Sequence, residues 1–190
     1  MQRHFLIALS LFLLFSAQPR NVPRVMIDAS VAPDFAELIR DTWWRFLGFF
    51  AERSDCFGDV RIVAVHTLAD RADYDPASAT VSVLVPERGS LLRAALVHEW
   101  AHHLEFQCPA QMELRPAFLA AQGNPPNTPW RAEHGSVNLP AYRWAAIPSE
   151  QYAETVAAAV LDNRALRTPV NITDNGIRVI TAWARKETLP

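Results

Sequence analysis

The sequence has little of several features that mark common functional classes. Acidic and basic residues nearly balance, with 20 Asp and Glu against 18 Lys and Arg, and Lys186 is the only lysine. The net charge of -2 offers no basic patch for nucleic acid or for an anionic membrane surface. The chain also shows no internal repeat, no glycine-rich phosphate loop and no Ser-His-Asp signature. We therefore expect no nucleic-acid partner and no chemistry of the nucleotide-binding or serine-hydrolase kind.

Long hydrophobic runs are also scarce, and the clearest one lies at the N-terminus. Arg3 and His4 precede an apolar run over residues 5–15, which is shorter than the roughly 20 residues of a comfortable membrane span. Small residues follow it, as in a secretory signal peptide. A cut after Ala17 would leave Phe15 where a small residue is preferred, so residues 1–18 are either a cleaved signal peptide or a membrane anchor. Both alternatives predict a secreted or extracytoplasmic protein.

The rest of the chain is rich enough in apolar residues for one globular domain, which we assign to residues 22–190. Half of the 190 residues are hydrophobic. Short runs of strand type predict three strands, and apolar residues at helical spacing predict four helices, whereas the acidic, turn-rich residues 69–79 indicate a connection. We expect an α+β fold with a small sheet of three or more strands and a mostly helical C-terminal part. The strands are expected at 25–29, 60–68 and 80–85, and the helices at 33–53, 90–107, 148–162 and 173–186.

The most informative pattern is His98-Glu99-Trp100-Ala101-His102 in the predicted helix 90–107. Residues i and i+4 share a helix face, so both imidazoles can reach one metal ion while Glu99 stays within reach of a metal-bound water. This is the HExxH arrangement, in which two histidines bind zinc and the glutamate is the general base. Apolar residues on the opposite side of the helix favour burial of that side, which argues against an accidental match.

A third metal ligand is expected from the predicted helix 148–162. Glu150 and Glu154 lie one turn apart at its start, so one carboxylate can bind the metal while the other accepts the N–H of a ligating histidine. We favour Glu150 as the ligand, with Glu154 as the alternative. A solvated acidic helix start, which the helix dipole stabilises by itself, is the explanation without function.

HExxH followed by Glu150-Gln151-Tyr152-Ala153-Glu154 resembles the gluzincin metallopeptidases, in particular the lethal-factor-like branch and other small single-domain gluzincins. The resemblance covers residues 90–107 and 148–162. It implies a zincin-like fold, Zn²⁺ as cofactor, Glu150 as the third ligand, and a peptide or protein as substrate. It also implies that the strand before the motif helix, residues 80–85, lines the cleft, where a peptide can pair with the edge of the sheet.

A peptidase of this kind also needs a donor that stabilises the oxyanion. Tyr142 lies where some of these families keep a phenol, and His134 is the alternative. Both lie in the proline-rich residues 123–148. A loop of this length either covers the cleft and shapes substrate choice or has no function. His103 and His66 are given no role, because His103 points away from the motif pair as a surface neighbour of Glu99 and His66 falls within a strand.

The chain contains two cysteines, Cys56 and Cys108. In an oxidising compartment an even number suggests a disulfide, and two buried free thiols are the alternative. Cys108 also falls where the metzincin pattern HExxHxxGxxH places its third histidine, but Glu105 replaces the glycine that this pattern needs, which argues against a metal-binding role.

The sequence thus predicts an extracytoplasmic zinc metallopeptidase with His98, His102 and Glu150 on the metal, Glu99 as base and Tyr142 as donor. One alternative keeps the zinc but has no turnover, as in a binding or structural module. Another is an interaction domain whose HExxH is accidental. No feature of the sequence identifies the substrate.

Overall fold

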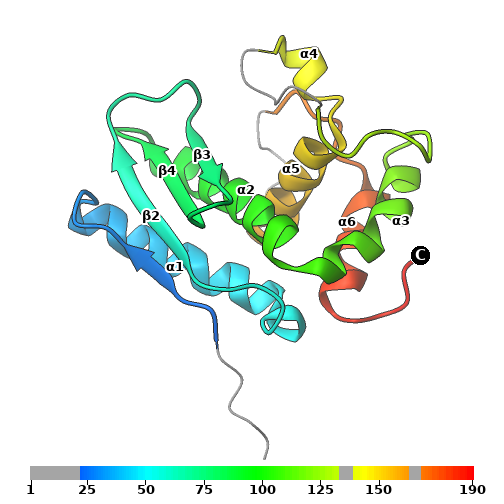
Figure 1. The fold of residues 1–190 in the computed structure, drawn as a ribbon, viewed down its shortest axis with the longest axis horizontal. Coiled ribbons are helices and arrows are strands. Elements are labelled where there is room, and N and C mark those ends of the chain that lie inside the picture. The colour runs from blue at the N-terminus through cyan, green and yellow to red at the C-terminus, as the bar shows by residue number, and fades with distance from the viewer. Residues whose placement is uncertain (1–21, 133–138, 163–167) are drawn as a thin grey trace, which may run out of the picture.

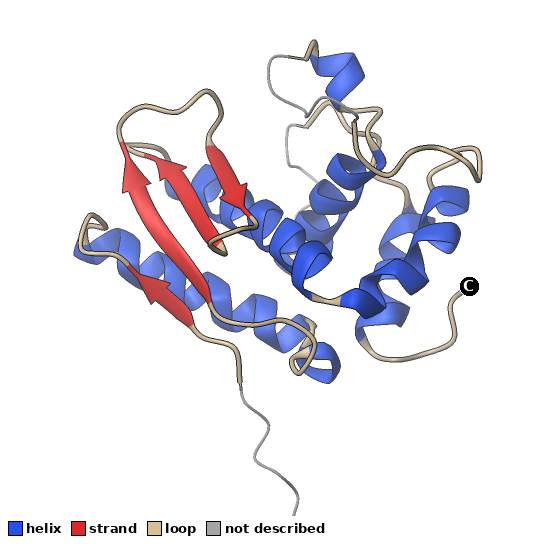
Figure 2. Cartoon of the chain, in the orientation of Figure 1, coloured by secondary structure: helices blue, strands red, loops and turns tan. Residues whose placement is uncertain are grey.

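The computed structural model describes residues 22–132, 139–162 and 168–190. The predicted signal or anchor segment and His134 lie outside these residues. The described chain is α+β, as predicted, with a small sheet on one side (Figures 1 and 2). On the other side lie the helices α3 (Arg115–Ala121), α5 (Pro148–Leu161) and α6 (Asp174–Ala184). Helix α2 (Gly89–Gln107) runs between these two parts. No helix of the described part is long and apolar enough to cross a membrane.

The sheet has four strands in the order β1-β2-β4-β3. The strands β1, β2 and β4 run parallel to one another, whereas β3 pairs antiparallel with β4 and forms one edge of the sheet. The prediction of a plain connection over residues 69–79 was therefore wrong, because it contains β3. The expectation that a peptide pairs with the sheet at residues 80–85 does not fit the structure, because β4 is paired on both sides. The strands are β1 (Val25–Ile27), β2 (Val60–Val65), β3 (Ala72–Asp75) and β4 (Thr80–Leu84).

Helix α1 (Pro33–Phe49) supplies aromatic residues to the core. Its Pro33 lies at the first helical position, where a backbone N–H would have no hydrogen-bond partner within the helix, so proline costs nothing there. Trp43 and Phe46 contact Trp100 of α2 with ring centroids 4.9 and 5.7 Å apart. Trp100 is fully buried, so this cluster fixes the inner face of the motif helix against α1 and the sheet.

Helix α2 ends where the chain can no longer stay helical. Cys108 is extended, because the following Pro109 disfavours a helical conformation in the residue before it. Cys108 forms a disulfide with Cys56, with the two Cα atoms 4.8 Å apart, which ties the end of α2 to the segment before β2. The chain then forms a short 3₁₀ helix, Pro109–Leu114, and α3 (Arg115–Ala121).

The remaining helices place the second predicted motif against the first. Helix α5 begins with Pro148 and packs along α2, while α6 is capped by the Thr173 hydroxyl, which accepts the Gly176 N–H at 2.9 Å. Between α3 and α5, residues 123–148 contain only one short helix in their described part. The three helices are α4 (Ala141–Trp144), α5 (Pro148–Leu161) and α6 (Asp174–Ala184).

Candidate metal centre and active site

The contact between α2 and α5 brings three predicted ligands together. His98 and His102 are one turn apart on the side of α2 that faces α5. Glu150 lies in the first turn of α5, where the positive end of the helix dipole favours a carboxylate. One ligand atom from each of these three residues lies within 4.8 Å of the others, a grouping that could hold a metal ion.

The distances within this group fit a tetrahedral site. The two histidine Nε2 atoms are 3.2 Å apart, and the Glu150 Oε2 atom lies 3.2 Å from His98 Nε2 and 3.5 Å from His102 Nε2. Two ligand atoms that are each about 2.0–2.1 Å from a tetrahedral metal lie roughly 3.3 Å apart. The three atoms therefore form a nearly equilateral triangle of the required size, with the fourth position free for a water molecule or a substrate oxygen.

Each histidine is held by a carboxylate at its other ring nitrogen. The Nδ1–H of His98 donates to Glu154 Oε1 and that of His102 donates to Glu105 Oε2, both at 3.1 Å. Because a carboxylate only accepts, both rings carry their proton on Nδ1 and point Nε2 at the shared centre. Sequence reasoning missed Glu105. The signal that points to it is its spacing of i+3 from His102, which puts both side chains on one face of the helix.

The charges of the group favour a cation. Burial lowers the pKa of His102, but hydrogen bonds to Glu105 and Glu150 outweigh this and raise it to about 9. Burial raises the pKa of Glu150, but hydrogen bonds from His102 and His98 hold it well below its usual range. In the metal-free chain, protons on the imidazoles balance the carboxylates. A divalent metal would replace those protons, since it binds only neutral imidazoles.

Glu99 lies beside the three ligands and lines the same cavity. Its side chain is buried, and this burial raises the pKa of its carboxyl group, with Glu150 and Asp73 adding to the effect against the two histidines. A carboxylate with a raised proton affinity next to an open ligand position is suited to proton transfer.

The cavity has a volume of about 690 Å³ and lies between the sheet and the C-terminal helices. One wall comes from residues 69–74, which lead into and form most of the edge strand β3, and the other from α5 and residues 131–132. Trp144 of α4 also lines it and stacks on the His98 ring, with centroids 5.9 Å apart and planes 17° apart. Part of the proline-rich stretch 123–148 therefore contributes to the cavity wall.

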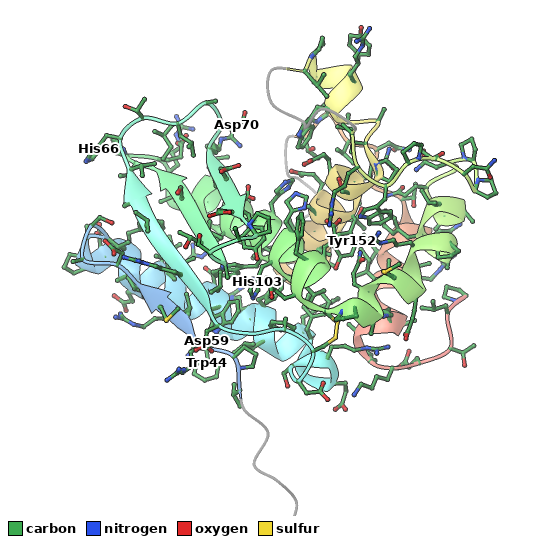
Figure 3. The ribbon with its side chains drawn as sticks, in the orientation of Figure 1. Trp44, Asp59, His66, Asp70, His103 and Tyr152 are labelled. Atoms are coloured by element: carbon green, nitrogen blue, oxygen red, sulfur yellow. A yellow bond between two sulfur atoms is a disulfide. The ribbon has the colours of Figure 1, made fainter. Side chains whose placement is uncertain are left out.

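Other residues singled out in the sequence lie elsewhere. Tyr142 is 71% exposed on α4 and is not among the described residues that line the cavity, so the structure does not bring it to the three ligands. His66 follows the end of β2 and is exposed (Figure 3). The prediction that His103 is a surface residue was wrong. Its ring is fully buried between α2 and the sheet, within hydrogen-bonding distance of Tyr74 and Gly58.

Comparison with known proteins gives no further guide to the site, since no protein family, curated protein or solved structure matches this chain.

Proposed function

We propose that this protein is a zinc-dependent peptide hydrolase of gluzincin type that acts in an extracytoplasmic compartment. The observation that carries the proposal is the convergence of His98, His102 and Glu150 at 3.2–3.5 Å, with the buried carboxylate of Glu99 beside them in one cavity. Two imidazoles and one carboxylate with an open fourth position are the donor set of catalytic zinc sites in peptidases.

In this proposal, different residues carry out different steps of the hydrolysis. A zinc ion held by the three ligands would polarise the substrate carbonyl and make a water molecule more acidic. Glu99 accepts the proton of the attacking water and returns it to the nitrogen of the leaving amine. In the metal-free chain, burial raises the pKa of Glu99, and the same burial favours a carboxylate that takes up a proton and passes it on. Glu154 and Glu105 hold the two imidazoles in the orientation that the reaction needs.

The position of the edge strand supports an extended peptide as substrate. β3 is paired with β4 on one side only, and its residues 72–74 line the cavity. A peptide added to this edge would make main-chain hydrogen bonds with β3 and carry its scissile carbonyl past Glu99. The role first expected for residues 80–85 therefore passes to β3.

Tyr142 stays our prediction for the donor that stabilises the oxyanion, on its position in the sequence. Because its side chain is exposed on the short helix α4, this role requires α4 to approach the cavity when substrate binds. The disulfide supports the proposed compartment, since such bonds persist in oxidising environments. Residues 1–18 remain our prediction for the signal or anchor that directs the chain there.

Metal analysis and one substitution test the proposal. The purified protein is expected to retain one equivalent of zinc at neutral pH and to cleave members of a mixed peptide library. Glu99→Gln keeps the shape of the side chain but removes the base, so zinc is expected to stay bound while cleavage falls by at least about 100-fold. Glu113→Gln is the matched control, because Glu113 is exposed and lies outside the cavity.

The possible outcomes separate the three hypotheses. Absence of bound zinc would overturn the proposal and leave an interaction domain with an accidental motif. Zinc without cleavage of any peptide would favour the binding or structural module. A Glu99→Gln variant that cleaves as fast as the parent would remove Glu99 from the mechanism.

A further inference from the structure

Glu105 is a buried carboxylate on the motif helix that holds His102 but neither binds the metal nor transfers a proton in the proposed mechanism. Its side chain is 0% exposed, and it lies one turn after His102 on α2. A buried carboxylate is tolerated only where hydrogen bonds and opposite charges compensate for the water it has lost. The groups that compensate for the burial of Glu105 therefore show which parts of the fold hold it in place.

The two oxygens of Glu105 have different partners. Oε2 accepts the Nδ1–H of His102 at 3.1 Å. Oε1 accepts the indole N–H of Trp130 at 2.6 Å and forms an ion pair with the Arg131 guanidinium, and a second guanidinium, that of Arg115, lies 3.8 Å away. One oxygen thus holds the metal-site histidine, while the other is held by residues outside the α2–α5 contact.

Trp130 and Arg131 are themselves fixed. The Arg131 guanidinium lies 3.7 Å from the centroid of the Phe106 ring on α2. The Trp130 indole packs against Phe118 of α3 and Tyr152 of α5, with centroids 5.9 and 5.8 Å away. Figure 3 shows Tyr152 on α5, on the side of the molecule where these helices meet. The pair therefore joins α2, α3 and α5.

The backbone of Trp130 also reaches the start of α5. Its carbonyl accepts the N–H of Ser149 at 2.9 Å, and Ser149 immediately precedes the third ligand, Glu150. Trp130 thus supports one ligand through the Glu105 carboxylate and another through the first turn of α5. Glu154, the carboxylate partner of His98, belongs to α5 itself, and within the described part of the chain it has no comparable contact with a third segment.

We propose that Glu105 is a positioning residue of the metal centre and that Trp130 and Arg131 hold it in place, so that they control how long the metal stays bound. The inference rests on the proposed function, because it assumes that His102 is a metal ligand. A carboxylate fixed on the far side of His102 keeps the proton on Nδ1 and aims Nε2 at the metal. Without the contacts to Trp130 and Arg131, the Glu105 carboxylate can rotate away from His102. The orientation of the His102 ring is then less constrained.

The first test removes one hydrogen bond and keeps the packing. Trp130→Phe deletes the N–H that donates to Glu105. Trp183→Phe is the matched control: its indole N–H donates to the Ala110 carbonyl at a distance of 3.2 Å, and neither residue lines the cavity. Zinc-loaded protein is mixed with an excess of a chromogenic chelator, and the rate of zinc release is measured. We expect Trp130→Phe to release zinc about 10-fold faster than the parent, and Trp183→Phe to match the parent.

A second pair of variants tests the charge. Arg131→Gln removes the guanidinium next to Glu105, and its side chain is 42% exposed, so the change does not open a buried cavity. Arg53→Gln is the control, because Arg53 also donates a hydrogen bond and lies over an aromatic ring, that of Trp183. Only Arg131→Gln is expected to speed zinc release. Thermal unfolding, recorded alongside, is expected to change similarly in both variants, which separates positioning from general stability.

A spectroscopic test addresses the imidazole directly. In zinc-loaded protein the Nδ1–H of a histidine bonded to a carboxylate gives a downfield proton signal, and Glu105→Gln is expected to move the His102 signal upfield because an amide is a weaker acceptor. Glu154→Gln should instead move the signal of His98. Glu105→Gln should also release zinc 10- to 100-fold faster, within the range typical of outer carboxylates.

The outcomes are distinguishable. If the parent binds no zinc, both the proposed function and this inference are overturned. If the parent binds zinc but Trp130→Phe and Arg131→Gln release it at the rates of their controls, the inference is overturned and the proposed function stands.

Discussion

His102 and His103 are neighbours in α2, yet they lie in opposite surroundings. His102 faces α5 and has a carboxylate on either side of its ring, from Glu105 and from Glu150. His103 lies on the side of α2 toward the sheet (Figure 3). The Gly58 carbonyl lies 3.0 Å from its Nε2 and the Tyr74 hydroxyl 2.9 Å from its Nδ1. A carbonyl only accepts, so Nε2 of His103 carries the proton and Nδ1 accepts from Tyr74.

The difference separates a histidine suited to a structural role from one whose surroundings suit a bound cation. The network of His103 is complete with neutral groups, and burial lowers the pKa of its ring. The network of His102 has more acceptors than donors, and its pKa is raised to about 9. A site with surplus buried negative charge gains from a bound cation, whereas one that is already satisfied does not. The predictions below act on one side of α2 and leave the other unchanged.

The largest expected effect is on the metal side. His102→Ala removes one of three ligands and should weaken zinc affinity by about 1,000-fold or more, roughly a third of the total binding free energy of such sites. His103→Ala should leave the affinity within a few-fold of the parent value. Competition with a zinc indicator measures both. Equal losses in the two variants would show that the comparison is wrong and that helix α2 responds as a whole.

The disulfide tests the structural side. It closes a sequence separation of 52 residues and ties the end of α2 to the segment next to Gly58. Replacing Cys56 and Cys108 together by alanine should lower the free energy of unfolding by about 3 kcal/mol, within the typical range for such a loop. Chemical denaturation of zinc-loaded protein measures it. Zinc stoichiometry should stay that of the parent, and loss of the metal in the folded variant would contradict the separation of the two sides.

A smaller effect is expected when the hydrogen bonds of His103 alone are removed. His103→Leu fills the buried space but leaves the Tyr74 hydroxyl and the Gly58 carbonyl without this partner. The loss in unfolding free energy should be about 2 kcal/mol, the cost of two weakened buried polar groups. Tyr74→Phe in the same background should cost little more, because its partner is already gone. Additive losses would mean that the two residues do not interact.

The smallest expected effect is a dependence on pH. The raised pKa of His102 stabilises the metal-free fold below the unfolded value of 6.5, and this contribution is lost as pH rises through about 9. Bound zinc keeps the imidazole neutral, so the stability of the zinc-loaded form does not fall with the loss of this proton. The difference in Tm between zinc-loaded and chelated protein should therefore widen between about pH 7 and about pH 9.5. A constant or narrowing difference would contradict the charge balance inferred for the site.

The long helices and three strands could be predicted from the sequence, whereas β3 and the short helices α3 and α4 were not. Helical spacing placed α1, α2, α5 and α6 to within a few residues, because their buried faces repeat at the period of the helix. The strand β3 reads Ala72-Asp73-Tyr74-Asp75, with two acidic residues that disfavour strands and Pro76 directly after it. Its alternation of apolar and acidic residues is only four residues long, and it is a strand because β4 offers it a partner.

The candidate site was predictable only in part for the same reason. The i, i+4 spacing of His98 and His102 puts them on one face of any helix, whatever surrounds it. Their distance from Glu150 depends instead on how α5 lies against α2, and the exposure of Tyr142 depends on where α4 lies. The partners of Glu105 come from residues 115, 130 and 131, which only the packing of α2, α3 and α5 brings together.

By itself, then, the sequence determined which side chains share a face and which segments are helical, since these follow from the geometry of single elements. It determined that the two histidines share one face of a helix, with Glu99 between them in the chain. Only the tertiary structure decided what each face meets: carboxylates for His102, a tyrosine and a backbone carbonyl for His103. That choice depends on packing between segments far apart in the chain, where burial removes water and leaves each polar group to whichever partner the fold supplies.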